Sequence, residues 1–340
     1  MAPAGHGIAR VNIERQVVQQ VVTPSADTRR GTLVGSTAVL LWSTLAALTT
    51  LSGDIPPFQL LAMTFTPAFL VGVGLWVWEA RRGRRSAGFL TGSDHNTSVI
   101  TGSPDADSPD KNPVLQRLRL SPAVWALGIY GLFGYHFAYF MGMRLAPPVE
   151  AGLLNYLWPL LIVVFAGFLP EERLRKRQVA GALLGFAGAG LIVTRGRGIY
   201  VDPQYLPGYA FAVAAGVIWA SYSVLSRRAR AVPTSAVGAF CGATAVLALL
   251  CHLLLEPTVW PSGGQWAAVL GLGLGPVGVA FYTWDYGVKR GDIQTLGALA
   301  YAAPLLSTGL LVGLGLAEPS WVLLAATALI TGGAVLASWK

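Results

Sequence analysis

The amino-acid sequence predicts an all-α membrane protein, in which ten transmembrane helices form two inverted five-helix repeats around a central cavity. Three observations support this fold class: an apolar composition, ten segments long enough to span a membrane, and an internal repeat. Hydrophobic residues make up 54% of the 340 residues and charged residues only 12%, about half the charged share of a soluble domain. The chain is therefore expected to lie mainly in the lipid bilayer.

Ten apolar segments have the length that a transmembrane helix needs, about 20 residues. They lie at residues 32–52, 56–78, 123–144, 149–169, 178–194, 207–225, 234–255, 265–288, 293–316 and 320–338. Gly and Pro occur throughout these segments, as membrane helices tolerate. Residues 1–31 lack the compact apolar region of a cleavable signal peptide, so the first helix is expected to target the chain to the membrane.

The basic residues predict the orientation of these helices. If the N-terminus is cytoplasmic and successive helices alternate, only Arg144, Arg195 and Arg197 of the 24 Lys and Arg residues fall outside, which leaves 21 on the cytoplasmic side. This asymmetry is typical of helical membrane proteins and places both termini in the cytoplasm. It also explains the net charge of +8 without a nucleic-acid partner.

The chain is divided into a tail and two repeats. Residues 1–31 are expected to form a cytoplasmic tail, residues 32–194 the first five-helix repeat, and residues 207–338 the second. Within the first repeat, residues 83–116 are expected to be a disordered cytoplasmic loop, because most of this segment is rich in Ser, Asp, Gly and Pro.

An internal repeat relates the two halves. One shift along the chain, which we call the proline offset, aligns Pro159 with Pro304 and Tyr156 with Tyr301. A larger shift, the tryptophan offset, aligns Trp42 with Trp219, because only the first half carries the long loop. Since five is an odd number, the second copy enters the membrane in the opposite sense. Such inverted repeats are typical of secondary transporters, which bind their substrates near the bilayer midplane between the repeats.

Two mid-helix prolines, Pro159 and Pro304, predict breaks in the fourth and ninth helices. Proline has no N–H, so the carbonyl groups of Asn155 and Ala300, four residues earlier, lose their helical donors. In hydrocarbon such groups are tolerated only against protein, water or a ligand. They either accept hydrogen bonds from a substrate ammonium group or belong to kinks that a neighbouring helix satisfies.

Aromatic and polar residues are concentrated on the third and fourth expected helices. Tyr and Trp in membrane helices often form interfacial belts, but rings with polar tips can also line a cavity for a flat amphipathic solute. The candidate substrate-binding residues are Tyr135, His136, Tyr139, Asn155, Tyr156, Trp158, Trp219, Trp42, Trp284 and Tyr301. His136 is either a proton-coupling group or a neutral, hydrogen-bonded histidine.

The ionisable residues argue against an enzyme or a channel. Asp285 is the one acidic residue inside an expected span, and an ion pair with Lys289 four residues later accounts for it. No spacing indicates a nucleophile with its base, paired carboxylates or a metal cluster, so no catalytic activity, cofactor or metal is expected. A channel would need a continuous polar lining. His252 has no evident polar neighbours and is assigned to structure.

Gly181 and Gly185, four residues apart in one expected helix, allow close helix contact. They are expected to pack within a repeat, with dimer formation as the alternative. The chain is accordingly expected to be a monomer or a homodimer.

Together these features resemble a known family. The two units resemble EamA-type repeats of the drug/metabolite transporter superfamily, and "LLNYLWP" with "GYHFAYFMGMRLAP" is similar to bacterial aromatic amino-acid exporters of the YddG type. The resemblance covers residues 32–338 apart from the long loop. It implies an inner-membrane protein that exports Phe, Trp, Tyr and other amino acids or metabolites by alternating access, as a facilitator or a proton-coupled carrier. It also places six residues around the cavity: Tyr135, His136, Tyr139, Tyr156, Trp158 and Trp219.

The alternative keeps the fold but makes the substrate a drug or another small metabolite, since aromatic walls also attract flat cations.

Overall fold

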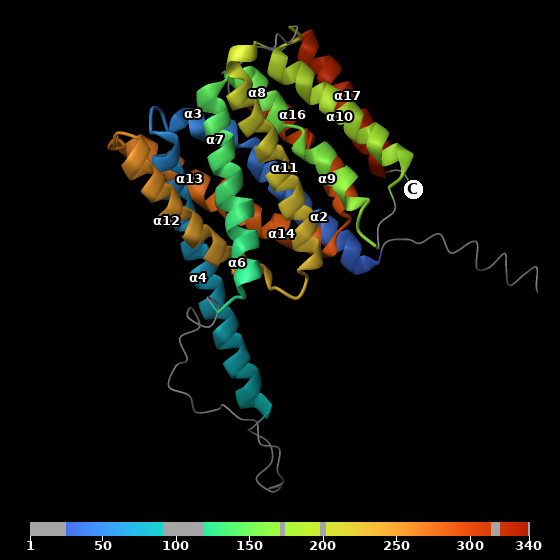
Figure 1. Ribbon diagram of the computed structural model, residues 1–340. Helices are drawn as coiled ribbons and strands as arrows, with labels where there is room; N and C mark the ends of the chain where they lie inside the picture. The colour runs from blue at the N-terminus through green and yellow to red at the C-terminus, as the bar shows by residue number, and fades with distance from the viewer. Residues whose placement is uncertain (1–24, 91–118, 171–173, 198–201, 314–319, 339–340) are drawn as a thin grey trace, which may run out of the picture.

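The computed structural model describes residues 25–90, 119–170, 174–197, 202–313 and 320–338, and every regular element within these ranges is a helix (Figure 1). The first half contains α2 (Ala26–Ser43), α3 (Leu45–Leu51), α4 (Pro57–Leu90), α6 (Pro122–Ile129), η1 (Tyr130–Gly134), α7 (Tyr135–Leu145), α8 (Pro148–Asn155), α9 (Trp158–Ala166) and α10 (Lys176–Thr194). The second half contains η2 (Pro203–Tyr205), α11 (Leu206–Arg228), η3 (Thr234–Ala236), α12 (Val237–Leu255), α13 (Gly263–Leu274), η4 (Gly275–Val279), α14 (Ala280–Arg290), α15 (Ile293–Leu299), α16 (Ala302–Gly313) and α17 (Trp321–Ser338).

Five helical segments among the described residues are long and apolar enough to cross a membrane. They are Ala26–Leu51, Pro57–Arg82, Pro203–Arg228, Thr234–Leu255 and Gly263–Arg290. Shorter apolar helices lie at Glu150–Ala166, Ile293–Ser307 and Trp321–Ala337. The prediction of an all-helical membrane protein is therefore confirmed.

Two predicted boundaries are wrong. Helix α2 begins at Ala26, inside the expected tail, because the Ser25 side chain accepts a hydrogen bond from the Thr28 N–H, 3.1 Å away, and caps the helix. Helix α4 continues to Leu90, inside the expected loop 83–116. The greater part of that loop, and of the tail, lies outside the described residues.

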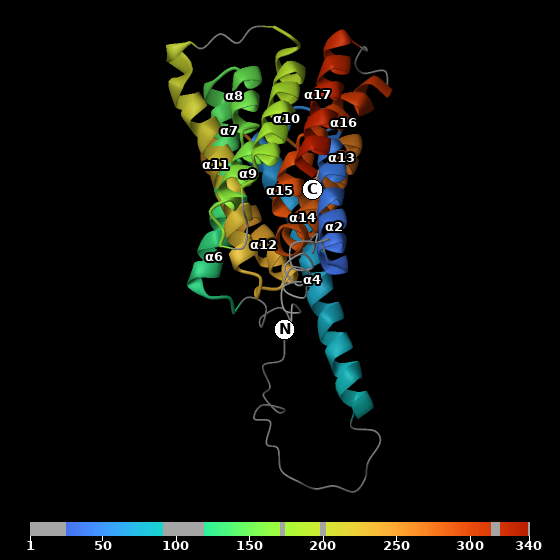
Figure 2. The ribbon, with the colours of Figure 1, turned by 90° about the vertical axis from the view of Figure 1, so that its right-hand side faces the viewer.

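The boundaries of several elements recur at the proline offset. The first residues of the π-helical segments η1 and η4, of helices α7 and α14, and of helices α10 and α17 are all related by this one shift. The contacts between halves are reciprocal as well, because α2 packs on α14 as α11 packs on α7, and α4 packs on α12. Figure 2 shows α10 and α17 side by side, an extensive contact in the bundle. Each half thus supplies neighbours for the other.

Glycine allows the closest of these contacts. A Cβ atom on Gly287 of α14 would lie 2.5 Å from the Cα atom of Gly35 in α2, so only glycine fits at this crossing. In the same way Gly181 meets the backbone of Gly333 in α17, and Gly185 meets the ring of Tyr301. The expectation that Gly181 and Gly185 pack within one repeat is therefore wrong, because their contacts are with the other half of the chain.

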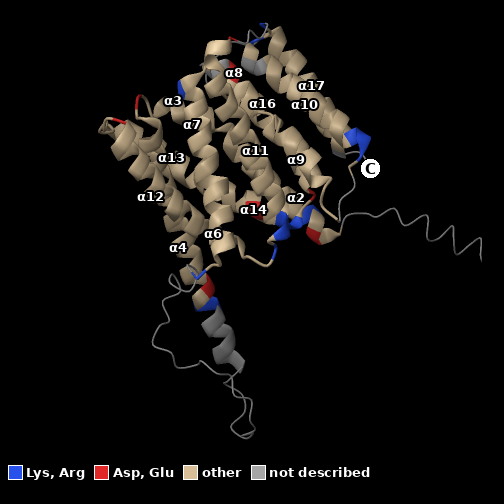
Figure 3. Cartoon of the chain, in the orientation of Figure 1, with Lys and Arg blue, Asp and Glu red and all other residues tan. Residues whose placement is uncertain are grey.

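Basic side chains gather at one end of the bundle, where α2 and α10 begin and α11 and α14 end (Figure 3). We call this the basic end, and the opposite end the outer end. Among the described residues, the basic side chains at the outer end are Arg144, at the end of α7, and Arg195 and Arg197, after α10. The charge is thus strongly asymmetric along the axis of the bundle.

Candidate substrate-binding site

Aromatic side chains from six helices meet in the core and form what we call the aromatic cluster. Its members are Trp42 of α2, Phe65 of α4, Tyr135, His136 and Tyr139 of α7, Trp158 of α9, Trp219 of α11, and Phe281 and Trp284 of α14. The ring centroid of Trp42 lies 5.1 Å from that of Trp284 and 5.9 Å from those of Trp158 and Trp219. Tilted and edge-to-face pairs of this kind contribute about 0.5–1.5 kcal/mol each beyond burial. The cluster therefore joins both halves of the chain.

The two π-helical segments hold side chains of this cluster. Trp42 donates its indole N–H to the carbonyl oxygen of Pro276 in η4, 3.1 Å away. His136 Nδ1 lies 2.7 Å from the carbonyl oxygen of Leu132 in η1. Because a carbonyl only accepts, Nδ1 carries the proton, and Nε2 of a neutral ring remains an acceptor. π-Helical turns are common at functional sites, and here both turns orient rings of one cluster.

The helical chain is interrupted just before each of the two prolines. Helix α8 ends at Asn155 and α9 begins at Trp158, while α15 ends at Leu299 and α16 begins at Ala302. The first break makes Trp158 the first residue of α9, so that its indole ring reaches the aromatic cluster. The start of a helix also leaves backbone N–H groups without intrahelical acceptors.

Tyr301 satisfies one of these N–H groups and does not join the aromatic cluster. Its hydroxyl accepts a hydrogen bond from the N–H of Leu160, the third residue of α9, at 3.1 Å. The ring is fully buried in a separate group that includes Val163 and Ile330. Tyr301 was a predicted substrate-binding residue, but the structure makes it a cap that one half of the chain supplies to a helix of the other half.

Asn155 and Tyr156 lie at the same break, beside α7. The Asn155 amide N–H donates to the hydroxyl of Tyr135, 3.4 Å away, while the buried Asn155 Oδ1 has no hydrogen-bond partner among the described residues. Tyr156 is close enough to Tyr135 and Tyr139 for electrostatic interaction among their hydroxyls. A buried acceptor without a partner requires an explanation, and this one lies on a side chain that contacts the Tyr135 hydroxyl.

Three residues that contact the predicted site residues were not foreseen from the sequence. Phe281 stacks on Phe65 with a centroid distance of 5.6 Å, and Ser223 accepts the indole N–H of Trp284 at 3.1 Å. Phe281 is the counterpart of His136 at the proline offset, so the repeat itself could have identified it. For Phe65 and Ser223 the sequence holds no comparable signal, because each is an ordinary helical residue until its neighbours are known.

The predicted ion pair between Asp285 and Lys289 is confirmed. The Lys289 ammonium lies 2.9 Å from the carboxylate, and both side chains are buried. Thr234 also donates to Asp285, at 2.8 Å, and Lys289 donates to the carbonyl oxygen of Val232, at 3.0 Å. The Asp285 carboxylate is therefore already paired within the protein.

A cavity of about 570 Å³ lies at the basic end. It is lined by Asp27, Thr28, Arg30, Arg227, Arg230, Tyr286, Lys289 and Arg290. Lys289 lines this cavity and also belongs to the buried ion pair with Asp285. The rings of the aromatic cluster, by contrast, contact one another directly.

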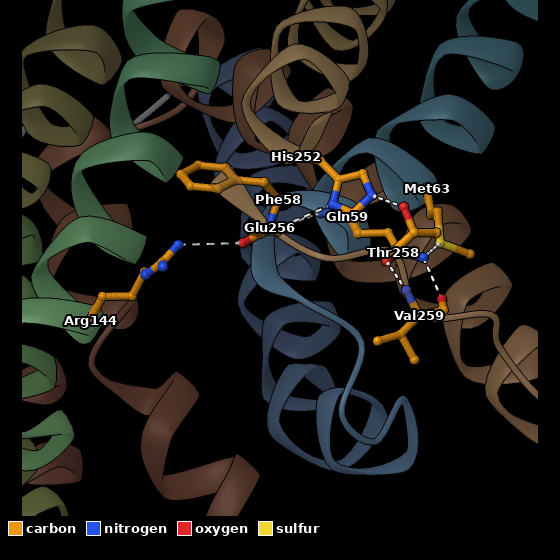
Figure 4. Close-up of polar contacts among 8 residues, drawn as sticks. All are labelled: Phe58, Gln59, Met63, Arg144, His252, Glu256, Thr258 and Val259. Carbon is orange, nitrogen blue, oxygen red and sulfur yellow. Dashed lines mark hydrogen bonds and ion pairs between the residues drawn. The ribbon is translucent and has the colours of Figure 1, made fainter. Parts of the chain in front are cut away.

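A second polar group lies at the outer end, around Glu256 (Figure 4). The assignment of His252 to a site without polar neighbours is wrong, because its Nδ1 lies 3.2 Å from Glu256 and its Nε2 lies 3.0 Å from the Thr258 hydroxyl. The Glu256 carboxylate also accepts the backbone N–H groups of Phe58 and Gln59, each at 3.1 Å. Because these N–H groups begin α4, Glu256 caps that helix from the end of α12.

These features define a class of protein: a bundle of apolar helices, two of them broken, around buried aromatic residues is typical of a membrane transporter. The model of the EamA-like transporter family matches residues 29–194 and again residues 206–339. The chain belongs to the EamA-like transporter family, and it is a membrane transporter and not an enzyme.

Known relatives extend this comparison. The chain is 52% identical over 308 residues to a protein of Ancylobacter novellus named aromatic amino acid exporter YddG, covering 90% of this chain and 96% of the relative. It is 28% identical over 218 residues to the biotin transporter of Salmonella typhimurium, covering 62% and 68%. A crystal structure with 51% sequence identity superposes with a TM-score of 0.77, over 91% of this chain and 96% of the other.

Proposed function

We propose that this protein exports aromatic amino acids (Phe, Trp and Tyr), with other amino acids or metabolites as further substrates, across a bacterial inner membrane by alternating access. The observation that carries the proposal is the aromatic cluster next to the unpartnered Oδ1 of Asn155. The 52% identity to a protein named as such an exporter supports it. An aromatic amino acid has a flat ring and an ammonium group, and the site offers rings and an acceptor.

Each group of the substrate has a proposed partner. The substrate ring would lie against the indole rings of Trp42, Trp158, Trp219 and Trp284 and the ring of Tyr135, which favour offset and edge-to-face contacts. The ammonium group would donate to Asn155 Oδ1 and to carbonyl oxygens at the break before Pro159. The hydroxyls of Tyr135, Tyr139 and Tyr156 would then hydrogen-bond the carboxylate.

The proposed architecture has ten transmembrane helices in two inverted repeats, residues 32–194 and 207–338. The remaining five spans are α6–η1–α7, α8–α9, α10, α15–α16 and α17. The single offset that relates corresponding elements, the reciprocal contacts and the double family match support this arrangement. Because each repeat has an odd number of spans, the second is inverted, and the aromatic cluster lies between the two.

We assign the basic end to the cytoplasm, with both termini on that side. The gathering of basic residues there supports this orientation, because cytoplasmic loops carry the excess of Lys and Arg. The cavity at the basic end then faces the cytoplasm, where the substrate is produced. The protein is proposed to act as a monomer in the bilayer, since Gly181 and Gly287 are already used in contacts within the chain, with a homodimer as the alternative.

The second candidate is export of a drug or another small metabolite by the same fold. The relative named biotin transporter supports a broad range of substrates in the family. A cationic drug would need a buried carboxylate, however, and the buried Asp285 is paired with Lys289. The observations therefore favour an amino acid.

The decisive experiment measures flux of labelled phenylalanine and tryptophan in proteoliposomes that contain only this protein, with and without an imposed pH gradient. Saturable flux that excess unlabelled aromatic amino acid blocks supports the proposal, and dependence on the gradient separates a proton-coupled carrier from a facilitator. Empty vesicles are the blank. Absence of flux with correctly folded protein would reject aromatic amino acids and favour the second candidate, which the same vesicles test with other labelled metabolites.

A further inference from the structure

We propose that Arg144 and Glu256 form a latch that closes the outer end of the transporter during its cycle, and that this latch is loosened in the present conformation. The inference rests on the alternating access proposed above. Arg144 lies in the last turn of α7, the helix that carries Tyr135, His136 and Tyr139, whereas Glu256 ends α12. A contact between these two residues therefore controls how far one wall of the substrate site lies from the neighbouring helices.

Glu256 is the fixed half of the latch. Its side chain is 3% exposed, and its carboxylate is held by the backbone N–H groups of Phe58 and Gln59 and by His252. The Gln59 side chain adds two hydrogen bonds to the backbone of Val259, one as donor at 2.6 Å and one as acceptor at 3.0 Å. These bonds fasten the α12–α13 connection to the start of α4, as Figure 4 shows.

Arg144 is the movable half. Its guanidinium Nη1 lies 3.8 Å from the Glu256 carboxylate, and the side chain is 46% exposed. A pair with this separation and exposure contributes at most about 1 kcal/mol. Figure 4 shows Arg144 approaching from α7, on the side of Glu256 opposite His252. Such a contact can form and break without disturbing the rest of the group.

The equivalent position in the other repeat carries a basic residue whose bonds are shorter and more fully buried. Lys289 is the counterpart of Arg144 at the proline offset and lies at the basic end of α14. It is buried, bonded to Asp285 and to the carbonyl oxygen of Val232. Aromatic residues five positions earlier in the same two helices show the same difference in exposure. Trp284 is 1% exposed, whereas its counterpart Tyr139 is only partly buried. The basic residue at the basic end is thus held by short, buried bonds, whereas its counterpart at the outer end is held by a longer, partly exposed one.

The two acidic anchors are also related by the repeat. Glu79 is the counterpart of Glu256 at the tryptophan offset, and it accepts a hydrogen bond from the Ser235 hydroxyl at 3.2 Å. The same offset relates Ser235 to Phe58, whose N–H Glu256 accepts. Each carboxylate therefore holds the start of the other half's second long helix. The two carboxylates thus occupy equivalent positions, but Glu256 accepts backbone N–H groups whereas Glu79 accepts a side-chain hydroxyl.

Double electron–electron resonance on the full chain tests the latch directly. Spin labels replace Leu206, at the start of α11 beside α7, and Trp260, in the α12–α13 connection, both of which are exposed. Cys241 and Cys251 are replaced by Ala in the parent, so that only the labels react. We expect two distance populations in the parent in lipid nanodiscs, and loss of the shorter one in Arg144→Gln. Arg144→Lys, which keeps the charge, should retain part of it.

Arg197→Gln is the matched control, because it removes an exposed Arg from the same end without touching the latch. The proposal is overturned if Arg144→Gln gives the same distance distribution as Arg197→Gln, or if the parent shows a single distance. Phenylalanine flux is measured on the same variants. A shift in distances without any flux in the parent would leave the latch standing and reject the substrate assignment, whereas flux without a shift would reject the latch alone.

Discussion

The hydrogen bond from Leu160 to Tyr301 predicts that Tyr301→Phe weakens the fold without weakening substrate binding. The substitution keeps the fully buried ring and removes one oxygen atom, so the packing against Val163 and Ile330 is unchanged. The Leu160 N–H then loses the acceptor that lies 3.1 Å away. It cannot turn to a helical carbonyl, because the helix is interrupted at Tyr156 and Leu157.

The expected magnitude follows from the cost of a buried N–H without a partner, about 1–3 kcal/mol of unfolding free energy. Tyr156→Phe is the matched control, because Tyr156 is the counterpart of Tyr301 at the proline offset and its hydroxyl is proposed to bind the substrate. We expect Tyr301→Phe to lower the free energy of unfolding by about 2 kcal/mol with an unchanged KM for phenylalanine. Tyr156→Phe should raise KM and leave stability nearly unchanged.

Unfolding by SDS titration in mixed micelles measures the first quantity, and flux in proteoliposomes measures KM. The reasoning would be refuted if Tyr301→Phe raised KM severalfold at unchanged stability, because that result would place the Tyr301 hydroxyl on the substrate. Equal losses of stability in both variants would also contradict it, since only one of the two hydroxyls caps a helix.

Three further predictions concern the site and the helix crossings. Trp158→Ala should reduce phenylalanine flux at least about tenfold, since it removes a ring that contacts three other indoles. Immunoblots of the membrane fraction should show normal insertion of this variant. As a control, replacement of the exposed Trp260 by Ala should leave transport normal. His136→Gln should change flux and the pH dependence of flux by less than about twofold. The reason is that Gln can still donate a hydrogen bond to the Leu132 carbonyl oxygen, and the other neighbours of the ring include the phenyl rings of Phe65 and Phe281. Loss of the pH dependence in vesicle flux would instead make His136 a proton carrier. Gly287→Ala should destabilise the protein by about 1–3 kcal/mol in SDS titration, because α2 and α14 must separate, whereas Gly332→Ala meets no atom within 4 Å and should be neutral.

The sequence predicted the helices well because hydropathy and proline act locally. The expected span at residues 234–255 coincides with η3 and α12, and the break before Pro159 follows from the missing N–H. Helix ends were less predictable, as α4 shows, because a polar helix outside the membrane has no hydropathy signal. Local signals thus suffice for the elements of this fold but not for their limits outside the bilayer.

The candidate site was only partly predictable for a different reason. The four tryptophans at positions 42, 158, 219 and 284 do meet in one cluster. Tyr301, however, shares with Tyr156 the position three residues before a mid-helix proline. Only its partner across the bundle, the Leu160 N–H, shows that it caps a helix. The same applies to Gly181, whose neighbour belongs to the other half. Contacts exchanged between repeats depend on their relative placement, which no local pattern records.

In the alternating-access mechanism proposed above, the differences between the two proposed repeats bear on which end of the transporter is closed at rest. If the copies were identical, the inward-open and outward-open conformations would have equal free energies by symmetry. The two copies differ in the residue one turn before the basic side chain. This residue is Asp285 for Lys289, with which it forms an ion pair, and Phe140 for Arg144. Lys289 is therefore paired within its own helix, whereas Arg144 depends on a distant carboxylate that also holds α4. A difference of about 1.4 kcal/mol between two such contacts shifts the ratio of conformations tenfold. We infer that divergence between the copies sets the resting conformation, while the symmetry of the backbone keeps the other conformation accessible.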